Sequence, residues 1–323
     1  ADVFEISKKQ GVIALVHDAI TSEFNTLPRL LKFKWILSVE AIENNYNRQY
    51  QVTKELSTLL YKNGITPIIL KGFAISQYYP VPKHRECGDV DIFTGVRYND
   101  ANNCFEECGA KVRYDYYVHS HISYKGVTIE NHQFCIGIRG DKSKKQFASY
   151  LERLCYKYQY EKTGNARFIV PSADFNALFL TMHGLNHFLS EGIKLRHILD
   201  WALLLKAEQN NIDWTEFYHW ADKMHMARFA DALTAISVKY FGLEITNPAI
   251  HTTSPYADRI LEDTLFKSEG IHNKGYSAWK ARWLLIKNKF AFGWKYHKIY
   301  QKSVIVELVR SVFGFLFEKN PKL

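Results

Sequence analysis

Apolar residues recur every three or four positions through residues 3–63, which is the period of an amphipathic helix. Gly64 follows the last of these positions and suits the end of a helix, because glycine readily adopts the left-handed conformation found there. The next stretch, ITPIIL, is short and rich in β-branched residues, so it predicts a buried strand. The chain is therefore expected to begin with helices and to enter a sheet only after Gly64.

Short strands and short helices then alternate over residues 60–140. The pattern predicts a short helix in FAISQYY, ended by Pro80 and Pro82, a strand in DVDIFT and a helix in NDANNCFEECGA. Two or three strands are expected in KVRYDYYVHSHISYKGVTIENHQFCI, with a turn at Lys125-Gly126. This region therefore predicts a compact mixed sheet with helices.

The helical period returns after this region. One helix is expected in DKSKKQFASYLERLCYKYQY, and two helices, joined near residues 190–192, in ADFNALFLTMHGLNHFLSEGIKLRHILDWALLLKAEQN. We therefore expect an α+β chain in which N-terminal helices precede a small mixed-sheet core and a helical domain follows it. The expected boundaries are residues 1–60, 61–165 and 166–323.

Composition supports a folded chain with a large core. Of the 323 residues 47% are hydrophobic and 15% aromatic, and the five cysteines show no CxxC spacing. This argues against a disulfide framework and against a zinc knuckle. The N-terminus shows no basic region followed by an apolar run, and the longest apolar runs are too short to span a bilayer. A cytoplasmic, reducing compartment is therefore expected.

The net charge of +9 is concentrated in one segment. Residues 270–306 contain eight Lys or Arg and no Asp or Glu, and aromatic residues lie between the basic ones. Three interpretations fit residues 274–302: an amphipathic helix with a solvated basic face, an RNA-binding surface whose aromatics stack on bases, or a surface that meets an anionic membrane.

Candidate chemistry centres on Asp89-Val90-Asp91. On a strand, the two aspartates lie on one face, roughly 6.6 Å apart at about 3.3 Å per residue, and Val90 lies on the other. Carboxylates held side by side repel each other unless a cation lies between them. Mg²⁺ prefers oxygen ligands, so the pair predicts a magnesium site.

Two further features accompany this pair. Lys71-Gly72 joins the apolar run to the next helix, and glycine with a lysine charge suits a phosphate-binding turn. Glu130 alternates with Thr128 and His132 on a later strand, which makes it the best candidate for a third carboxylate. Metal ions held by three acids could activate an attacking hydroxyl and stabilise a leaving pyrophosphate.

In this order LKG, an arginine, GDVDIF and VTIENH resemble the polymerase-β-like nucleotidyltransferase superfamily, and more specifically its group of uncharacterised nucleotidyltransferases. The similarity extends into MHGLNHFLSEGIKLRHILDWALLL, to about residue 206. It implies a small mixed sheet, a helical second domain, Mg²⁺ or Mn²⁺, and an NTP substrate. It further implies that Asp89, Asp91 and Glu130 are metal ligands and that Lys71 and Gly72 form the phosphate turn.

Other candidate residues have two interpretations each. Arg85 either contacts phosphate or pairs with Asp89. His183 and His187 share a helix face without the acid that a zinc protease needs, so they are expected to contact nucleotide or acceptor, or to pack at the domain junction. Arg196 either pairs with Asp200 along a helix or points at a triphosphate.

The leading hypothesis is a magnesium-dependent nucleotidyltransferase that moves an NMP from an NTP to an unidentified acceptor and releases pyrophosphate. Two alternatives remain open. Phe73 occupies the position after Gly72 where the superfamily has a small hydroxyl residue, which motivates a catalytically silent nucleotide-binding protein. The basic segment at residues 274–302 motivates an enzyme that acts on RNA.

Overall fold

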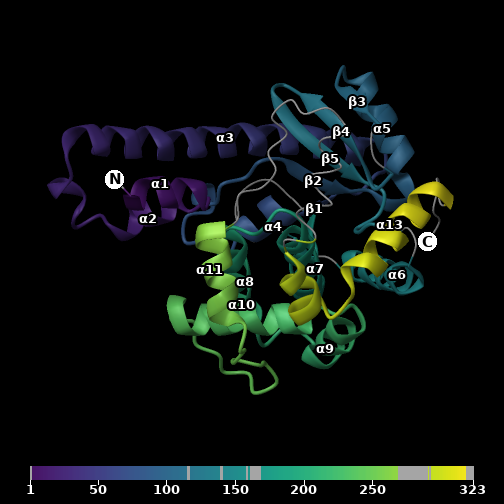
Figure 1. The fold of residues 1–323 in the computed structure, drawn as a ribbon. Coiled ribbons are helices and arrows are strands. Elements are labelled where there is room, and N and C mark those ends of the chain that lie inside the picture. Colours follow the sequence, from purple (N-terminus) through teal and green to yellow (C-terminus); the bar gives the residue numbers. More distant parts are fainter. Residues whose placement is uncertain are drawn as a thin grey trace. The chain divides into compact units, whose positions relative to one another are not determined.

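The computed structural model describes residues 2–114, 117–138, 141–157, 159–160, 169–267, 290 and 292–317 (Figure 1). The chain forms two compact units. The first contains Ala1–Gly137 and Tyr150–Phe175, and the second contains Ile138–Ser149 and Asn176–Leu323. The N-terminal helices thus belong to the same unit as the sheet.

The first unit is built on a mixed sheet flanked by helices. Its helices are α1 (Asp2–Lys9), α2 (Ile13–Ala19), α3 (Arg29–Lys62), α4 (Lys71–Ser76) and α5 (Tyr98–Glu107), with single 3₁₀ turns at η1 (Phe24–Thr26), η2 (Pro82–His84) and η3 (Gly95–Arg97). Its strands are β1 (Ile68–Leu70), β2 (Val90–Phe93), β3 (Lys111–Arg113), β4 (His119–Tyr124), β5 (Val127–His132), β6 (Gln159–Tyr160) and β7 (Ile169–Val170).

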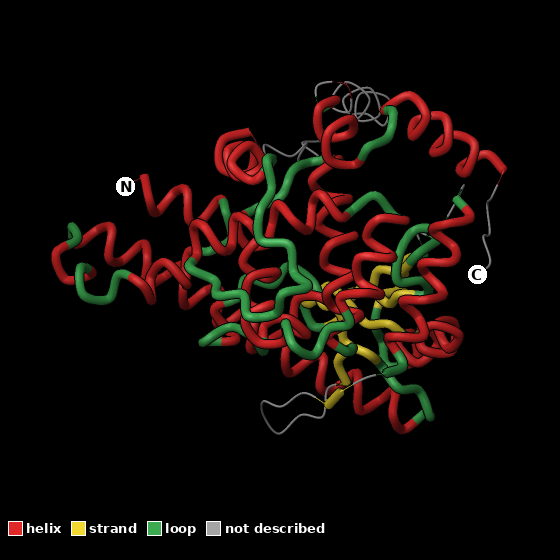
Figure 2. The backbone as a smooth tube through the Cα atoms, turned by 90° about the horizontal axis from the view of Figure 1, so that it is seen from below, coloured by secondary structure: helices red, strands yellow, loops and turns green. Residues whose placement is uncertain are grey.

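The strands lie in the order β3-β4-β5-β2-β1-β7-β6. Figure 2 colours the strands yellow and the helices red. β2 runs parallel to β5 and β1 parallel to β7, whereas β1 and β2 run antiparallel. The expected α+β fold with a small mixed sheet is confirmed. The short strands β6 and β7 were not expected, since two residues carry no measurable period.

One face of this sheet is the core of the unit. Alternate residues of β2, β4 and β5 point into it and pack against apolar side chains of α3 and α5. The members of this cluster include Val90, Ile92, Ile122, Val127 and Ile129 from the sheet, Val52, Leu56 and Leu60 from α3, and Ala101 and Phe105 from α5. Because side chains alternate along a strand, the residues between these ones lie on the opposite face.

The N-terminal part of the first unit has its own small core. Phe4, Ile13 and Val39 pack around Trp35, whose indole N–H donates a 3.0 Å hydrogen bond to the carbonyl oxygen of Ile13. The loop before β2 is held by His84, whose ring nitrogens lie 2.6 Å from an Asp18 oxygen and 2.8 Å from a Glu43 oxygen. α2 and α3 thereby hold η2, the turn that leads to Arg85.

The second unit is helical. It contains most of α7 (Ala173–Ser190), the first part of α6 (Lys142–Cys155), and α8 (Leu195–Glu208), α9 (Trp214–Lys223), α10 (Ala227–Phe241), α11 (Ala257–Glu262), η4 (Asp263–Lys267), η5 (Lys295–Tyr300) and α13 (Val304–Phe317). Trp201 of α8 packs on Trp214 and Phe217 of α9, and its indole N–H donates to Thr234 of α10 over 2.9 Å. The two helices expected on either side of residues 190–192 are confirmed.

Most of the basic segment lies outside the described residues. These undescribed basic residues are Lys274, Lys280, Arg282, Lys287 and Lys289. Of the remaining three, Lys298 is exposed and Lys302 is partly buried. Lys295 is fully buried, and its ammonium lies 2.5 Å from Asp263 and over the rings of Phe188 and Phe292. Lys295 is therefore an internal ion-pair partner and contributes nothing to a basic surface.

No helix among the residues that the structure describes is both long enough and apolar enough to cross a membrane.

Phe73, the residue that stands in place of an expected hydroxyl, is part of the core. Its ring stacks on Tyr46 of α3, with centroids 4.7 Å apart, and the residue is 4% exposed. Phe73→Ala should therefore lower the free energy of unfolding by about 3–5 kcal/mol, the usual cost of truncating a buried phenylalanine.

Urea unfolding followed by tryptophan fluorescence measures this effect. Phe33→Ala is the matched control, because Phe33 lies on α3 and is 50% exposed. The control should change the unfolding free energy by less than about 0.5 kcal/mol. Equal losses in the two variants would show that Phe73 does not have the core role described.

Candidate active site

Lys71 lies where the first strand of the sheet meets a helix. β1 ends at Leu70, which is paired in register with Asp91 of the neighbouring β2, and α4 begins at Lys71. Lys71 has a φ of 44°, in the left-handed region that few residues other than glycine adopt. Non-glycine residues in this region are concentrated at functional sites. The strained backbone follows from turning directly from strand into helix, and the lysine side chain reaches the neighbouring strand.

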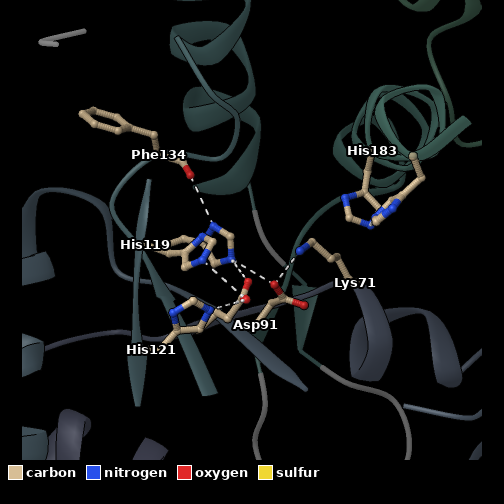
Figure 3. A network of polar contacts seen from close by, with 9 residues as sticks. Lys71, Asp91, His119, His121, Phe134 and His183 are labelled. Atoms are coloured by element: carbon tan, nitrogen blue, oxygen red, sulfur yellow. Dashed lines mark hydrogen bonds and ion pairs between the residues drawn. The ribbon is translucent and has the colours of Figure 1, made fainter. Parts of the chain in front are cut away.

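Asp91 is the centre of the site. It is 3% exposed, and its Oδ1 lies 2.6 Å from the Lys71 ammonium and 2.9 Å from Nε2 of His132 (Figure 3). Burial favours the neutral acid, yet the adjacent Lys71 charge and the His132 hydrogen bond hold the pKa of Asp91 well below its usual range. Burial also opposes the charge on Lys71, but Asp91 outweighs it and raises the lysine pKa.

Asp89 is in a less favourable position. It lies in the bend just before β2 rather than on the strand itself, and it is half-buried. Burial, followed by repulsion from Asp91, raises the pKa of Asp89 to about 6. The negative charges of Asp91 and Glu130 repel the Asp89 carboxylate, and the Lys71 ammonium is bonded to Asp91 instead. The expectation that both aspartates belong to the strand is corrected at Asp89.

Glu130 lies beside Asp91 on the sheet. The parallel pairing of β2 with β5 puts the two residues in register, and His121 of β4 faces Glu130 from the other side. Glu130 contacts three imidazoles: His121 at 3.2 Å, His119 at 3.4 Å and His132 at 3.4 Å. Burial opposes ionisation of Glu130, but the His132 hydrogen bond outweighs it and lowers the glutamate pKa.

The imidazoles of this cluster differ in charge preference. Burial opposes the charged form of His132, but its hydrogen bonds to Asp91 and Glu130 outweigh this and raise its pKa. For His119, burial and then the neighbouring His132 charge lower the pKa to about 4. His119 is therefore neutral at pH 7.

Gly72 and Arg85 lie against each other. A Cβ on Gly72 would lie 3.2 Å from an Arg85 guanidinium nitrogen and 3.3 Å from the Cys87 sulfur, which explains a glycine at this position. Arg85 is 6% exposed and donates to Cys87 Sγ over 3.3 Å. The Lys71-Gly72 pair is thus the first turn of α4, packed on the buried Arg85.

The other expected site residues belong to the second unit. His183 and His187 lie on α7 with their Nε2 atoms 3.0 Å apart, and His187 Nδ1 contacts Glu191. His197 of α8 joins them, since each of the three histidines brings one nitrogen within 4.8 Å of the others. Arg196 lies on α8, where Asp200 is buried. The roles expected for His183, His187 and Arg196 toward nucleotide stay predictions.

Asp89, Asp91 and Glu130 influence one another's ionisation on the carboxylate side of the site. These acids repel one another, but Lys71 and His132 outweigh the repulsion at Asp91 and Glu130, whose pKa values are lowered, and not at Asp89. The pKa of Asp89 stays raised, because burial and then repulsion by Asp91 favour its neutral form. Carboxylate oxygens are the ligands that Mg²⁺ prefers, so Asp89 and Asp91 are the residues that would hold it.

The contacts of His119, His121 and His132 with Glu130 were not predicted from the sequence. The signal that locates them is the turn at Lys125-Gly126, where both residues have positive φ and β4 folds back directly onto β5. A two-residue hairpin fixes the register of its strands. Counting back from this turn pairs His121 with Glu130 and His119 with His132, as the structure does.

The mixed sheet with its flanking helices and the following helical unit are consistent with a nucleotidyltransferase core. The chain belongs to a family of uncharacterised nucleotidyltransferases, whose family model matches residues 1–242. Comparison with the curated proteins and with the solved structures gave no match.

The buried charges at Asp91 predict a large effect on stability. Asp91→Asn leaves the Lys71 ammonium and the His132 imidazole without their carboxylate, and breaking a buried ion pair in this way costs about 3–5 kcal/mol. Asp89→Asn is the matched control, because removing its charge at pH 7 relieves repulsion from Asp91.

Urea unfolding at pH 7 without added metal compares the two variants. Asp91→Asn should unfold at a much lower urea concentration than the wild type, and Asp89→Asn at an equal or higher one. Similar losses in both variants would contradict the central place given to Asp91.

Proposed function

We propose that the protein transfers a nucleoside monophosphate from an NTP to a hydroxyl or phosphate group of an acceptor. An acceptor oxygen would attack the α-phosphorus and form a new P–O bond, while the bond from the α-phosphorus to the bridging oxygen breaks and pyrophosphate leaves. Membership of the nucleotidyltransferase family supports this class of reaction. The observation that carries the proposal is that Asp91 of β2 and Glu130 of β5 lie side by side, with Lys71 bonded to Asp91.

Lys71 would change partners when substrate binds. Its ammonium is bonded to Asp91 at 2.6 Å, and its side chain is 17% exposed, so a triphosphate placed beside Asp91 could attract it. A lysine provides a compact positive charge that suits phosphate oxygens. The ion pair with Asp91 thus neutralises that one carboxylate before substrate arrives and would leave Lys71 in position for phosphate.

The three carboxylates would have different tasks. When bound, Mg²⁺ supplies charge neutralisation for the triphosphate and lowers the pKa of a coordinated hydroxyl. Asp89 and Asp91 offer oxygen atoms that would hold it. Glu130, in register with Asp91, would orient the acceptor hydroxyl and accept its proton.

A second candidate function is nucleotide binding without transfer. Phe73 favours it, because the side chain that follows Gly72 is apolar and packed on Tyr46, so this position supplies no hydroxyl to phosphate. Binding of Mg·NTP without pyrophosphate release, across a broad panel of hydroxyl- and phosphate-bearing acceptors, would favour this candidate over transfer.

Calorimetric titration with Mg·ATP, Mg·CTP, Mg·GTP and Mg·UTP tests the role of Lys71. Lys71→Met should weaken binding of the preferred nucleotide by about tenfold to hundredfold, the value of one charge-assisted contact. Lys125→Met is the matched control, because Lys125 is exposed in the β4–β5 turn and pairs with Glu55. If Lys71→Met and the wild type bind the preferred nucleotide with equal affinity, Lys71 does not contact the nucleotide.

A further inference from the structure

Two histidines and one glutamate form a cluster whose imidazole nitrogens the proposed transfer does not use. His119 of β4 and Glu130 and His132 of β5 each bring one ligand atom within 4.8 Å of the others. The Nε2 atoms of His119 and His132 lie 3.4 Å from different oxygens of Glu130 (Figure 3). Ligands that share one metal ion at about 2.1 Å are separated by similar distances.

The cluster is built on a rigid element. β4 and β5 are paired along their whole length, and His119 faces His132 directly across the hairpin. The side chains of His119, Glu130 and His132 are 17%, 15% and 4% exposed, so the packing around them limits their rotamers. A site held this way requires little reorganisation to bind an ion.

His132 already has the outer contact that orients a metal-binding imidazole. Its Nδ1 lies 3.4 Å from the carbonyl oxygen of Phe134, to which it can donate, and this leaves Nε2 directed at Glu130. Histidine ligands of metals almost always donate their second ring N–H to a carbonyl or carboxylate, which fixes the tautomer. The contact to Phe134 is the expected one for Nε2 coordination.

The donor set selects the kind of ion. Two imidazoles and one carboxylate are the ligands of zinc sites that keep an open position, and of several other first-row transition metals. Mg²⁺ prefers oxygen ligands, so two imidazole nitrogens and one carboxylate suit it poorly. We propose that His119, Glu130 and His132 bind one divalent transition-metal ion, with Zn²⁺ strongly favoured over Mg²⁺, beside the carboxylates of Asp89 and Asp91.

This binding has a consequence for Asp91. In the structure Nε2 of His132 also lies 2.9 Å from Asp91 Oδ1. An Nε2 atom that coordinates an ion has released its proton to solvent and no longer donates to Asp91. The ion therefore replaces the His132–Asp91 hydrogen bond, while the Lys71 ammonium stays bonded to Asp91.

The histidine cluster of the second unit does not offer an equivalent site. There Nδ1 of His197 accepts the backbone N–H of Lys194 over 3.0 Å. A neutral imidazole that accepts at Nδ1 carries its proton on Nε2, so that ring has no second lone pair for an ion. The experiment below nevertheless uses a His187→Ala background, so that only the β4–β5 cluster is tested.

The test is calorimetric titration of the metal-free protein, in the His187→Ala background, with Zn²⁺ and with Mg²⁺, without nucleotide. We expect one equivalent of Zn²⁺ to bind. His132→Ala and His119→Ala should each weaken Zn²⁺ binding by more than about a hundredfold, which exceeds the effect of changing an outer contact of a metal ligand. His121→Ala is the matched control: His121 also contacts Glu130 but lies outside the group of mutually close ligand atoms. It should weaken binding by no more than about tenfold to hundredfold, the cost of losing an outer contact to a metal ligand.

Substitution with Co²⁺ gives a second readout, because its visible absorption reports coordination by nitrogen and oxygen in a site with few ligands. The band should be present in His121→Ala and absent in His119→Ala, a half-buried position that tolerates substitution even if His132→Ala fails to fold. Absence of Zn²⁺ binding, equal Zn²⁺ binding with and without His119→Ala in the His187→Ala background, or equal affinity for Mg²⁺ would each overturn the proposal. Nucleotide is absent throughout, so the result is independent of whether nucleotidyl transfer occurs.

Discussion

A buried carboxylate that needs positive partners determines the arrangement of the first unit. Asp91 is 3% exposed in the middle of a sheet, where an isolated charge would be costly, and it is held by Lys71 and His132. Lys71 reaches it because the backbone turns from β1 straight into α4 at a positive φ. His132 reaches it because β5 lies parallel to β2. The positive φ at Lys71 and the parallel pairing of β2 with β5 thus together supply the partners of one buried charge.

The alternation of residues was enough to predict much of this site. The apolar neighbours Val90 and Ile129 predict that Asp91 and Glu130 lie on the polar face of their strands. In the structure Val90 and Ile129 do lie in the core. The contact of Gly72 with Arg85 could not be predicted in the same way. It depends on the path of the loop between α4 and β2, which has no period, and on the ion pairs that hold η2.

The sheet face has two chemically different sides. Asp89 and Asp91 on the β2 side offer only oxygen atoms, whereas the hairpin of β4 and β5 offers imidazole nitrogens around Glu130. Glu130 contacts the histidines and lies in register with Asp91, so it connects the two sides. A hard ion and a transition-metal ion would therefore prefer different places on one face, with Asp91 and Glu130 responding to both.

The central claim is that the Lys71–Asp91 ion pair opens to receive Mg²⁺ and a triphosphate. A crystal structure with Mg²⁺ and a non-hydrolysable NTP tests it most directly. The account predicts metal density beside the oxygens of Asp89 and Asp91, with the Lys71 ammonium moved from Asp91 onto a phosphate oxygen. A nucleotide bound elsewhere, with Lys71 still 2.6 Å from Asp91, would contradict it.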